Sequence, residues 1–192
     1  MIAVIDYGAG NIFSVKNALD YLGFDSMLTN KKEDIENADA LILPGVGAFP
    51  SAMSMLEKSG LIETIVSQSK QKPFLGICLG MQLIFEKGYE FEECNGLGLI
   101  PGCVNKMEEP DLIIPHMGWN KLEIQNDCPL LSGLEKDSYV YFVHSYKAEC
   151  DDKNIAAYSV YGGNTVYGAQ FHPEKSGDTG LKILKNFGGL IK

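Results

Sequence analysis

The stretch that most constrains the fold of this chain is KPFLGICLGMQLIFE, residues 72–86. It opens with a proline and a short apolar run, which is typical of a buried parallel strand. Glycines then flank Cys78 on both sides, and the apolar residues that follow, through Phe85, have helical spacing. A strand, a sharp glycine-flanked turn at a nucleophile and a helix form a nucleophile elbow, here as G-x-C-x-G.

The predicted elbow would give Cys78 a reactive environment. At the first turn of a helix, unpaired N–H groups and the helix dipole favour a thiolate. The amide of Leu79 would point at an oxyanion formed on an attacked carbonyl. Taken alone, G-x-C-x-G fits a buried structural cysteine about equally well, so the rest of the chain must decide.

Length and charge narrow the class of protein. A chain of 192 residues suits one domain with a proper core, and we expect a single domain over residues 1–192. The net charge of -9 argues against binding nucleic acid or anionic membranes. A strand rather than a signal peptide follows Met1, and no apolar run approaches the length of a membrane span. Five scattered cysteines fit a reduced, cytoplasmic environment.

The order of predicted elements indicates an α/β fold. Strands 2–6, 24–29 and 40–43 alternate with helical segments that end near residues 22 and 69, which predicts an open, mostly parallel, flavodoxin-like sheet with helices on both faces. From Gly96 onward, short strands separated by turn residues predict an antiparallel or mixed extension. The candidate strands there are 103–107, 112–115, 120–124, 139–143, 155–160 and 165–171, followed by a helix over about 178–190.

Two glycine-rich turns fall at the carboxyl edge of the predicted sheet. The GAGN turn after the first strand lacks the third glycine of a dinucleotide fingerprint, and the second strand offers no well-placed acidic residue for a ribose. In PGVG, Gly45 and Gly47 surround Val46, so the peptide between them can rotate and bring an N–H close to a ligand. We expect a second oxyanion donor facing Cys78 here, although PGVG alone fits an ordinary turn equally well.

Three histidines could serve Cys78, and only His172 comes with its own orienting group. Glu174 lies two residues later, on the same side of an extended chain, and Pro173 stiffens the pair. A carboxylate that orients an imidazole facing a thiol is the arrangement of a nucleophilic triad. We therefore predict a Cys78–His172–Glu174 triad, and no zinc site, because ligand-type side chains do not fall at zinc-binding spacing.

The motifs GICLGMQ, PGVG and FHPE together resemble the class I (triad) glutamine amidotransferases. Within that family, IDYGAGN, PGVGAF, PHMGWN, FVHSY and FHPEKSG resemble the glutaminase subunits of imidazole glycerol phosphate synthases in histidine biosynthesis. The resemblance runs over nearly the whole chain.

This resemblance implies hydrolysis of L-glutamine to glutamate and ammonia, without a metal or an organic cofactor. The ammonia would pass to a cyclase subunit with a (β/α)8 barrel that makes imidazole glycerol phosphate and aminoimidazole carboxamide ribotide. By motif position, Cys78 is the nucleophile that forms a γ-glutamyl thioester, His172 is the general base and acid, and Glu174 orients it. The remaining residues have three implied roles: oxyanion amides at Leu79 and at Gly47 or Val46; substrate contacts at Gly45, Gln82, Ser145 and Tyr146; and a partner interface at Asn11, Trp119 and Lys175.

Some alternatives remain open from the sequence. A paralogue that feeds ammonia to an amidino-sugar pathway could carry the same motifs, and a stand-alone Cys-His hydrolase would act without a barrel. A catalytically silent binding module is disfavoured because all three triad residues are present. Trp119 could pack in the core instead of facing a partner, and His116 and His144 could be structural.

Overall fold

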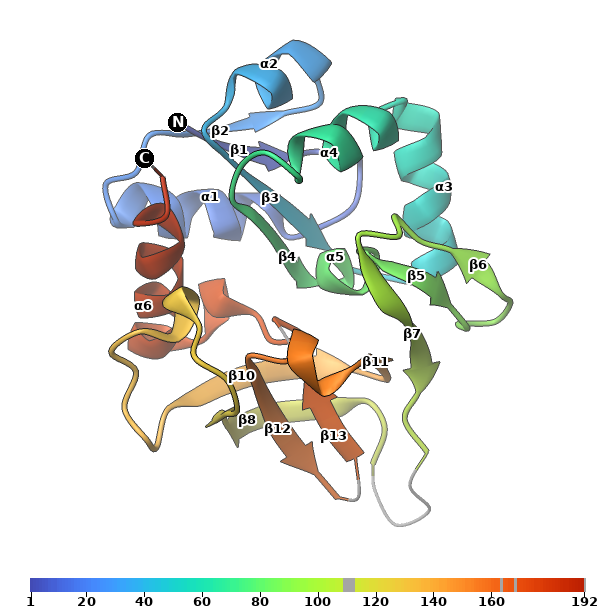
Figure 1. The fold of residues 1–192 in the computed structure, drawn as a ribbon, viewed down its shortest axis with the longest axis vertical. Coiled ribbons are helices and arrows are strands. Elements are labelled where there is room, and N and C mark those ends of the chain that lie inside the picture. The colour runs from blue at the N-terminus through green and yellow to red at the C-terminus, as the bar shows by residue number, and fades with distance from the viewer. Residues whose placement is uncertain (109–112, 163, 168, 192) are drawn as a thin grey trace.

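The parallel half of the fold is formed by the N-terminal strands (Figure 1). The structure is a computed structural model that describes residues 1–108, 113–162, 164–167 and 169–191. Four parallel strands form one sheet in the order β2-β1-β3-β4. They are β1 (Ile2–Ile5), β2 (Ser26–Thr29), β3 (Ala40–Gly45) and β4 (Phe74–Cys78).

Helices cover both faces of this sheet, as predicted. Alternate residues of each strand point to opposite faces. Ala3, Ile5, Leu41 and Leu43 pack in one core cluster with apolar residues of α2, α3 and α4. Ile2, Val4, Ala40 and Ile42 pack in another with residues of α1 and α6. These helices are α1 (Ile12–Tyr21), α2 (Lys32–Asn37), α3 (Phe49–Ser59), α4 (Ile62–Gln68) and α6 (Gly177–Gly188).

The helix after Cys78 is much shorter than predicted. It is a single turn, α5 (Leu79–Gln82), and the chain continues as strand β5 (Phe85–Gly88) instead of a helix through Phe85. The carbonyls of Leu83, Ile84 and Phe85 accept hydrogen bonds from the amides of residues 97–99 at 2.8–3.1 Å. These carbonyls are therefore used by a neighbouring segment, and no helix can form through them.

The remaining strands form three smaller sheets, which confirms the mixed extension. Their orders are β11-β7-β5-β6, β10-β8 and β13-β12-β9, and all described pairs are antiparallel except β5 with β7. The strands are β6 (Cys94–Asn95), β7 (Ile100–Lys106), β8 (His116–Lys121), β9 (Glu123–Ile124), β10 (Tyr139–His144), β11 (Tyr146–Glu149), β12 (Ala157–Tyr161) and β13 (Asn164–Tyr167). Two short 3-10 turns, η1 (Pro129–Leu131) and η2 (Asp152–Asn154), lie between these strands, and a third, η3 (Pro173–Lys175), lies between β13 and α6.

Several predicted boundaries in this half were wrong. Strand 120–124 divides into β8 and β9, and residues 113–115 of the predicted strand 112–115 are not a strand, while Leu112 lies outside the described residues. The last strand ends at Tyr167, so His172 stands in a loop before η3. Sequence reasoning missed α2, β6 and β11; β11 follows β10 after one residue because the chain changes sheets at Ser145. Over the described ranges, no helix has the length and hydropathy needed to cross a bilayer.

Candidate active site

Cys78 ends strand β4 in a backbone conformation that few residues adopt. Its φ is 54° and its ψ is -113°, which is a positive φ for a residue with a Cβ. Such a conformation costs on the order of 1–3 kcal/mol and persists only when its surroundings enforce it. Its amide donates to the carbonyl of Ala169 at 2.9 Å, and its strand neighbour in β3 is Gly45. Cys78 therefore occupies a strained elbow at the carboxyl edge of the parallel sheet.

Close backbone contacts explain the glycines around this elbow. A Cβ on Gly80 would lie 1.8 Å from the carbonyl oxygen of Leu43, and one on Gly76 would lie 2.6 Å from Cα of Met81. A Cβ on Gly45 would lie 2.6 Å from the amide nitrogen of Gly80. Since backbone atoms cannot move aside as a flexible side chain can, all three positions exclude larger residues. The predicted steric need for glycine on both sides of Cys78 is confirmed.

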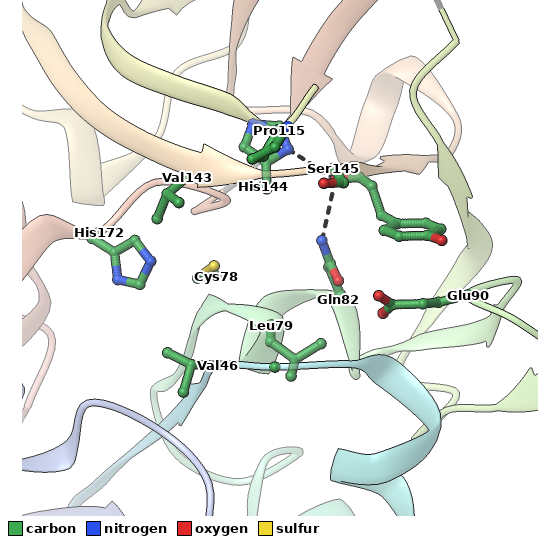
Figure 2. A pocket seen from close by; sticks show the side chains of 12 residues that line it. Val46, Cys78, Leu79, Gln82, Glu90, Pro115, Val143, His144, Ser145 and His172 are labelled. Atoms are coloured by element: carbon green, nitrogen blue, oxygen red, sulfur yellow. Dashed lines mark hydrogen bonds between the residues drawn. The ribbon is translucent and has the colours of Figure 1, made fainter. Parts of the chain in front are cut away.

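The structure brings His172 and Glu174 to the same site. His172 Nδ1 lies 2.8 Å from Glu174 Oε1, and the two side chains are only 3% and 1% exposed. The backbone of His172 is held twice, because its amide donates to the carbonyl of Tyr141 and its carbonyl accepts from the hydroxyl of Ser176. Figure 2 shows the imidazole turned into the pocket on the side of Cys78.

The electrostatics of His172 favour an imidazolium. Burial lowers the pKa of His172, but its interactions with the nearby Cys78 sulfur and with the Glu174 carboxylate raise it to about 9. At neutral pH the ring therefore holds a proton that it can donate. A protonated imidazole beside a sulfur is also what activates a cysteine as a nucleophile.

A cavity of about 280 Å³ opens over the elbow. This volume is close to the lower end of pockets that hold small molecules. Apart from Cys78 and His172, its walls include most of the residues predicted to serve as oxyanion donors or substrate contacts: Val46, Gly47, Leu79, Gln82, Ser145 and Tyr146. Gly45 is not among the residues lining the cavity and packs instead against the backbone of the elbow.

Gln82 is buried and already hydrogen-bonded to the pocket wall. Its side-chain nitrogen donates to Gln170 Oε1 at 2.8 Å and to the carbonyl of Tyr146 at 3.2 Å. Gln170 in turn places its side-chain nitrogen 3.6 Å from the Cys78 sulfur. Sequence reasoning missed Gln170, although its position two residues before His172 was an available signal.

Glu90 also escaped prediction, because it lies in an acidic run that no motif distinguishes. It lines the cavity, and its Oε2 accepts the amide of Phe49 at 2.8 Å, at the start of helix α3. Burial raises the pKa of Tyr146, and the negative charge of Glu90 adds to that shift. Figure 2 shows Glu90 and His172 on opposite sides of the pocket, with Cys78 between them. The pocket therefore has a carboxylate at the end far from His172.

The three residues predicted to face a partner differ in exposure. Trp119 on β8 is 52% exposed, and its ring meets that of Tyr141 edge to face at 6.0 Å. This exposure excludes core packing for Trp119. Lys175 in η3 is exposed, and Asn11 is partly buried just before helix α1. Among the described side chains, no group of three or more metal-ligand types is close enough to hold a metal ion.

The sequence of this chain matches a known protein family and several curated proteins over nearly its whole length. A family described as "Glutamine amidotransferase class-I" matches residues 3–189. The imidazole glycerol phosphate synthase subunit HisH of Bacillus thuringiensis (strain Al Hakam) is 51% identical, with 100% of this chain and 96% of that protein covered. HisH of Bacillus anthracis (strain A0248) is 50% identical over the same shares.

Solved structures share the fold at lower identity. A crystal structure of a glutamine amidotransferase superposes with a TM-score of 0.71 at 20% identity, covering 98% of this chain and 100% of that one. The structure of PurLQS from Thermotoga maritima gives a TM-score of 0.72 at 20% identity, covering 100% of this chain and 98% of that one.

Proposed function

This chain belongs to the class-I glutamine amidotransferase family, and we propose that it is the glutaminase subunit of an imidazole glycerol phosphate synthase. The observation that carries the proposal is that the strained Cys78 and His172 line one small pocket, with the buried Glu174 bonded to His172 behind it. The identity of 51% to HisH over the whole chain supports the particular synthase.

L-Glutamine would bind with its ammonium group toward Glu90 and its side-chain amide over Cys78. The Cys78 sulfur attacks the amide carbon, and the electron pair of the carbonyl moves onto oxygen. Two backbone amides, that of Leu79 and that of Gly47 or Val46, would stabilise this oxyanion. Each such donor is worth roughly 10²–10³ in rate.

His172 would then act as an acid and afterwards as a base. Its proton passes to the amide nitrogen as the carbon–nitrogen bond breaks, which releases ammonia and leaves a γ-glutamyl thioester on Cys78. The neutral imidazole next takes a proton from water, whose oxygen attacks the thioester carbon. The carbon–sulfur bond then breaks with its electron pair returning to the Cys78 sulfur, which releases glutamate and restores the starting pair of sulfur and protonated ring. Glu174 would hold the ring with Nδ1 protonated and support its positive charge in both steps.

A partner is required because free ammonia in water at neutral pH is mostly ammonium, which is no nucleophile. We propose a cyclase subunit with a (β/α)8 barrel that receives ammonia directly and docks near Asn11, Trp119 and Lys175. The exposed ring of Trp119 supports this face, since exposed aromatic residues are enriched at interfaces. The five free cysteines agree with a proposed location in the reducing cytoplasm.

The peptide between Gly45 and Gly47 offers a way to avoid wasting glutamine. We propose that in the isolated chain it presents a carbonyl toward Cys78, and that docking of the liganded cyclase favours the rotated state with an N–H. One missing oxyanion donor predicts a lone chain that is slower by about 10²–10³. A ligand can shift this equilibrium only by its differential affinity for the two states.

The test is steady-state glutamate production by the chain alone, with the cyclase, and with the cyclase plus its nucleotide ligand. Cys78→Ala serves as the control in each arm. A large rise only with the liganded partner supports the coupled synthase. Equal rates in all three arms would favour a stand-alone hydrolase, and stimulation by a cyclase of an amidino-sugar pathway instead would favour the paralogue. No glutamate in any arm would end the glutaminase proposal.

A further inference from the structure

His116 and His144 form a buried pair that the triad does not use. They are register partners on β8 and β10, and His116 Nδ1 lies 3.2 Å from His144 Nε2. The outer nitrogen of His144, Nδ1, lies 2.9 Å from the carbonyl oxygen of Tyr146. The outer nitrogen of His116, Nε2, lies 3.2 Å from Asn120 Oδ1. Three contacts in a row therefore connect Asn120 to the pocket residue Tyr146.

The two ends of this row both accept hydrogen bonds. The Tyr146 end is a backbone carbonyl. At the other end the amide orientation of Asn120 is fixed, because its Nδ2 donates to the carbonyl of Val160 at 2.9 Å and leaves Oδ1 toward His116. Three contacts between two acceptors and two rings need three N–H groups, but two neutral imidazoles carry only two.

The surroundings of the pair keep both rings neutral. His116 is 1% exposed and His144 is 6% exposed, and His116 stacks between Phe142 and Tyr161 at centroid distances of 5.0 and 4.0 Å. Burial lowers the pKa of His116, and it lowers that of His144 to about 4, where the nearby His172 acts in the same direction. The hydroxyl of Tyr161 donates to the carbonyl of Ile113 and so supplies nothing to the pair. A third proton is therefore not available near neutral pH.

We propose that His116 and His144 are positioning residues that switch together between two tautomers, and that only one of these holds the glutamine pocket. With both rings protonated on Nδ1, His116 donates to His144 and His144 donates to the Tyr146 carbonyl. With both protonated on Nε2, His144 donates to His116 and His116 donates to Asn120. A mixed state that serves both Tyr146 and Asn120 would leave two unprotonated nitrogens facing each other at 3.2 Å, so the pair serves one acceptor or the other.

This switch couples an exposed strand to the substrate pocket, and in that respect it rests on the proposed function. Asn120 follows Trp119 on β8, with its side chain on the opposite face of the strand, toward His116, whereas Tyr146 and Ser145 line the cavity. The Tyr146 carbonyl also accepts from Gln82, so it ties β11 to the helix of the elbow. A partner that docks on Trp119 and shifts β8 so that Asn120 moves away from His116 would release His116 and favour the Nδ1 tautomer that holds Tyr146.

Nitrogen NMR can read the tautomers directly, since the chain has only three histidines. Long-range ¹H–¹⁵N spectra of the isolated chain should give equal Nδ1–H fractions for His116 and His144. In Asn120→Ala, which removes the competing acceptor, both fractions should rise together. Asn126→Ala is the matched control, because its amide also bonds backbone carbonyls but lies away from the pair. A stable imidazolium, or two rings with independent fractions, would overturn the proposal.

Steady-state kinetics supply a second measurement, because replacing His116 and replacing His144 should change KM for glutamine in opposite directions. One neutral hydrogen bond is worth about 1 kcal/mol, or about fivefold in an equilibrium constant. Asn120→Ala and His116→Phe, which leave His144 free to hold Tyr146, should lower KM for glutamine in the lone chain by up to about fivefold. His144→Phe should raise KM by a similar factor.

A purely structural role would raise KM in both ring variants, and that result would overturn the proposal. If the wild type made no glutamate, the proposed function would fail, while the NMR measurement would still decide the tautomer switch. If a ring variant failed to fold, Asn120→Ala and the wild-type spectra would decide it.

Discussion

Cys78 and His172 face each other across one pocket, but the two sides of that pocket are held in place by different forces. On the cysteine side, backbone atoms of β3, β4 and α5 approach so closely that Gly45, Gly76 and Gly80 have no room for a Cβ. On the histidine side, hydrogen bonds fix the residues: His172 Nδ1 donates to the Glu174 carboxylate, and the Ser176 hydroxyl donates to the His172 carbonyl.

The difference shows which side can adapt. Close-packed backbone cannot yield by even one methyl group, so the nucleophile stays in position whatever its partners do. Hydrogen bonds can be exchanged at low net cost, so the side with His172, His144 and Tyr146 can respond to protons, substrate and a docked partner. We infer that the cysteine side supplies a fixed reaction centre and that control is exerted through the histidine side and through Val46.

The largest effect is expected on the cysteine side, where replacing Cys78 should remove activity without disturbing the packing. Cys78→Ala should lower the glutaminase rate by roughly 10⁶-fold, as removal of a nucleophile from a triad does. The fold should remain, because alanine replaces the small thiol at little packing cost and meets the same positive φ. Rate assays, thermal unfolding and trapping of a thioester with labelled glutamine check this. Normal turnover by the variant would end the triad assignment.

The next largest effect is expected on the histidine side, at Glu174. Glu174→Gln keeps the shape but loses the charge that supports the imidazolium, and the rate should fall by up to roughly 10⁴-fold. The loss should be smaller than that of His172→Ala, because the three residues act as a unit. If His144→Ala matched the loss of Cys78→Ala while His172→Ala did nothing, the base would have been paired wrongly.

The pH dependence follows from the raised pKa of His172. Wild-type kcat/KM should fall as pH rises through about 9, when the ring loses the proton needed by the leaving ammonia. The same proton stabilises the fold: its contribution is complete below the unfolded-state pKa of about 6.5 and is lost as pH rises through about 9. In Glu174→Gln both transitions should move to lower pH, and an unmoved profile would exclude the carboxylate as their cause.

The two glycines around Val46 allow the steric need for a glycine and its role in catalysis to be compared within one loop. Gly45→Ala should destabilise the fold, because its Cβ would lie 2.6 Å from the backbone of Gly80. Around Gly47 nothing lies within 4 Å, but its φ of 99° disfavours a side chain. Gly47→Ala should therefore destabilise the fold less than Gly45→Ala, through backbone strain alone, and lower the partner-stimulated rate by up to about 10²–10³, the value of one oxyanion donor. Unfolding curves and stimulated rates distinguish the two, and equal losses of stability would contradict the distinction.

The fixed side was the more predictable one for a physical reason. Steric demands restrict which residues a position accepts, so the glycines around Cys78 and the continuous apolar runs of β1 and β3 predicted both the elbow and the parallel sheet. Hydrogen-bond partners distant in sequence leave no such mark. Glu90 and Gln170 were therefore not predicted as pocket residues. The helix after Cys78 was predicted too long because the amides of residues 97–99 donate to the carbonyls that would have continued it.

His172 and Glu174 were found because they are neighbours in the sequence. Their spacing of two residues was visible, although the loop that carries them was mistaken for the end of a strand. The network through His116 and His144 joins residues of β8, β10 and β11, and only the fold reveals which acceptors those rings face.

The smallest of these effects tests whether Glu90 binds the ammonium group of the substrate. Glu90→Gln should raise KM for glutamine by about 10–100-fold, because a hydrogen bond to a charged group contributes about 1.5–3 kcal/mol. The value of kcat should change little, since Glu90 lies across the pocket from His172. The amide retains an oxygen that can accept from Phe49, so the start of helix α3 should keep its cap. Glu93→Gln is the matched control, because that carboxylate pairs with Lys87 on the surface. If both variants kept the wild-type KM, the ammonium of glutamine would have to bind elsewhere, and the substrate orientation proposed above would be wrong.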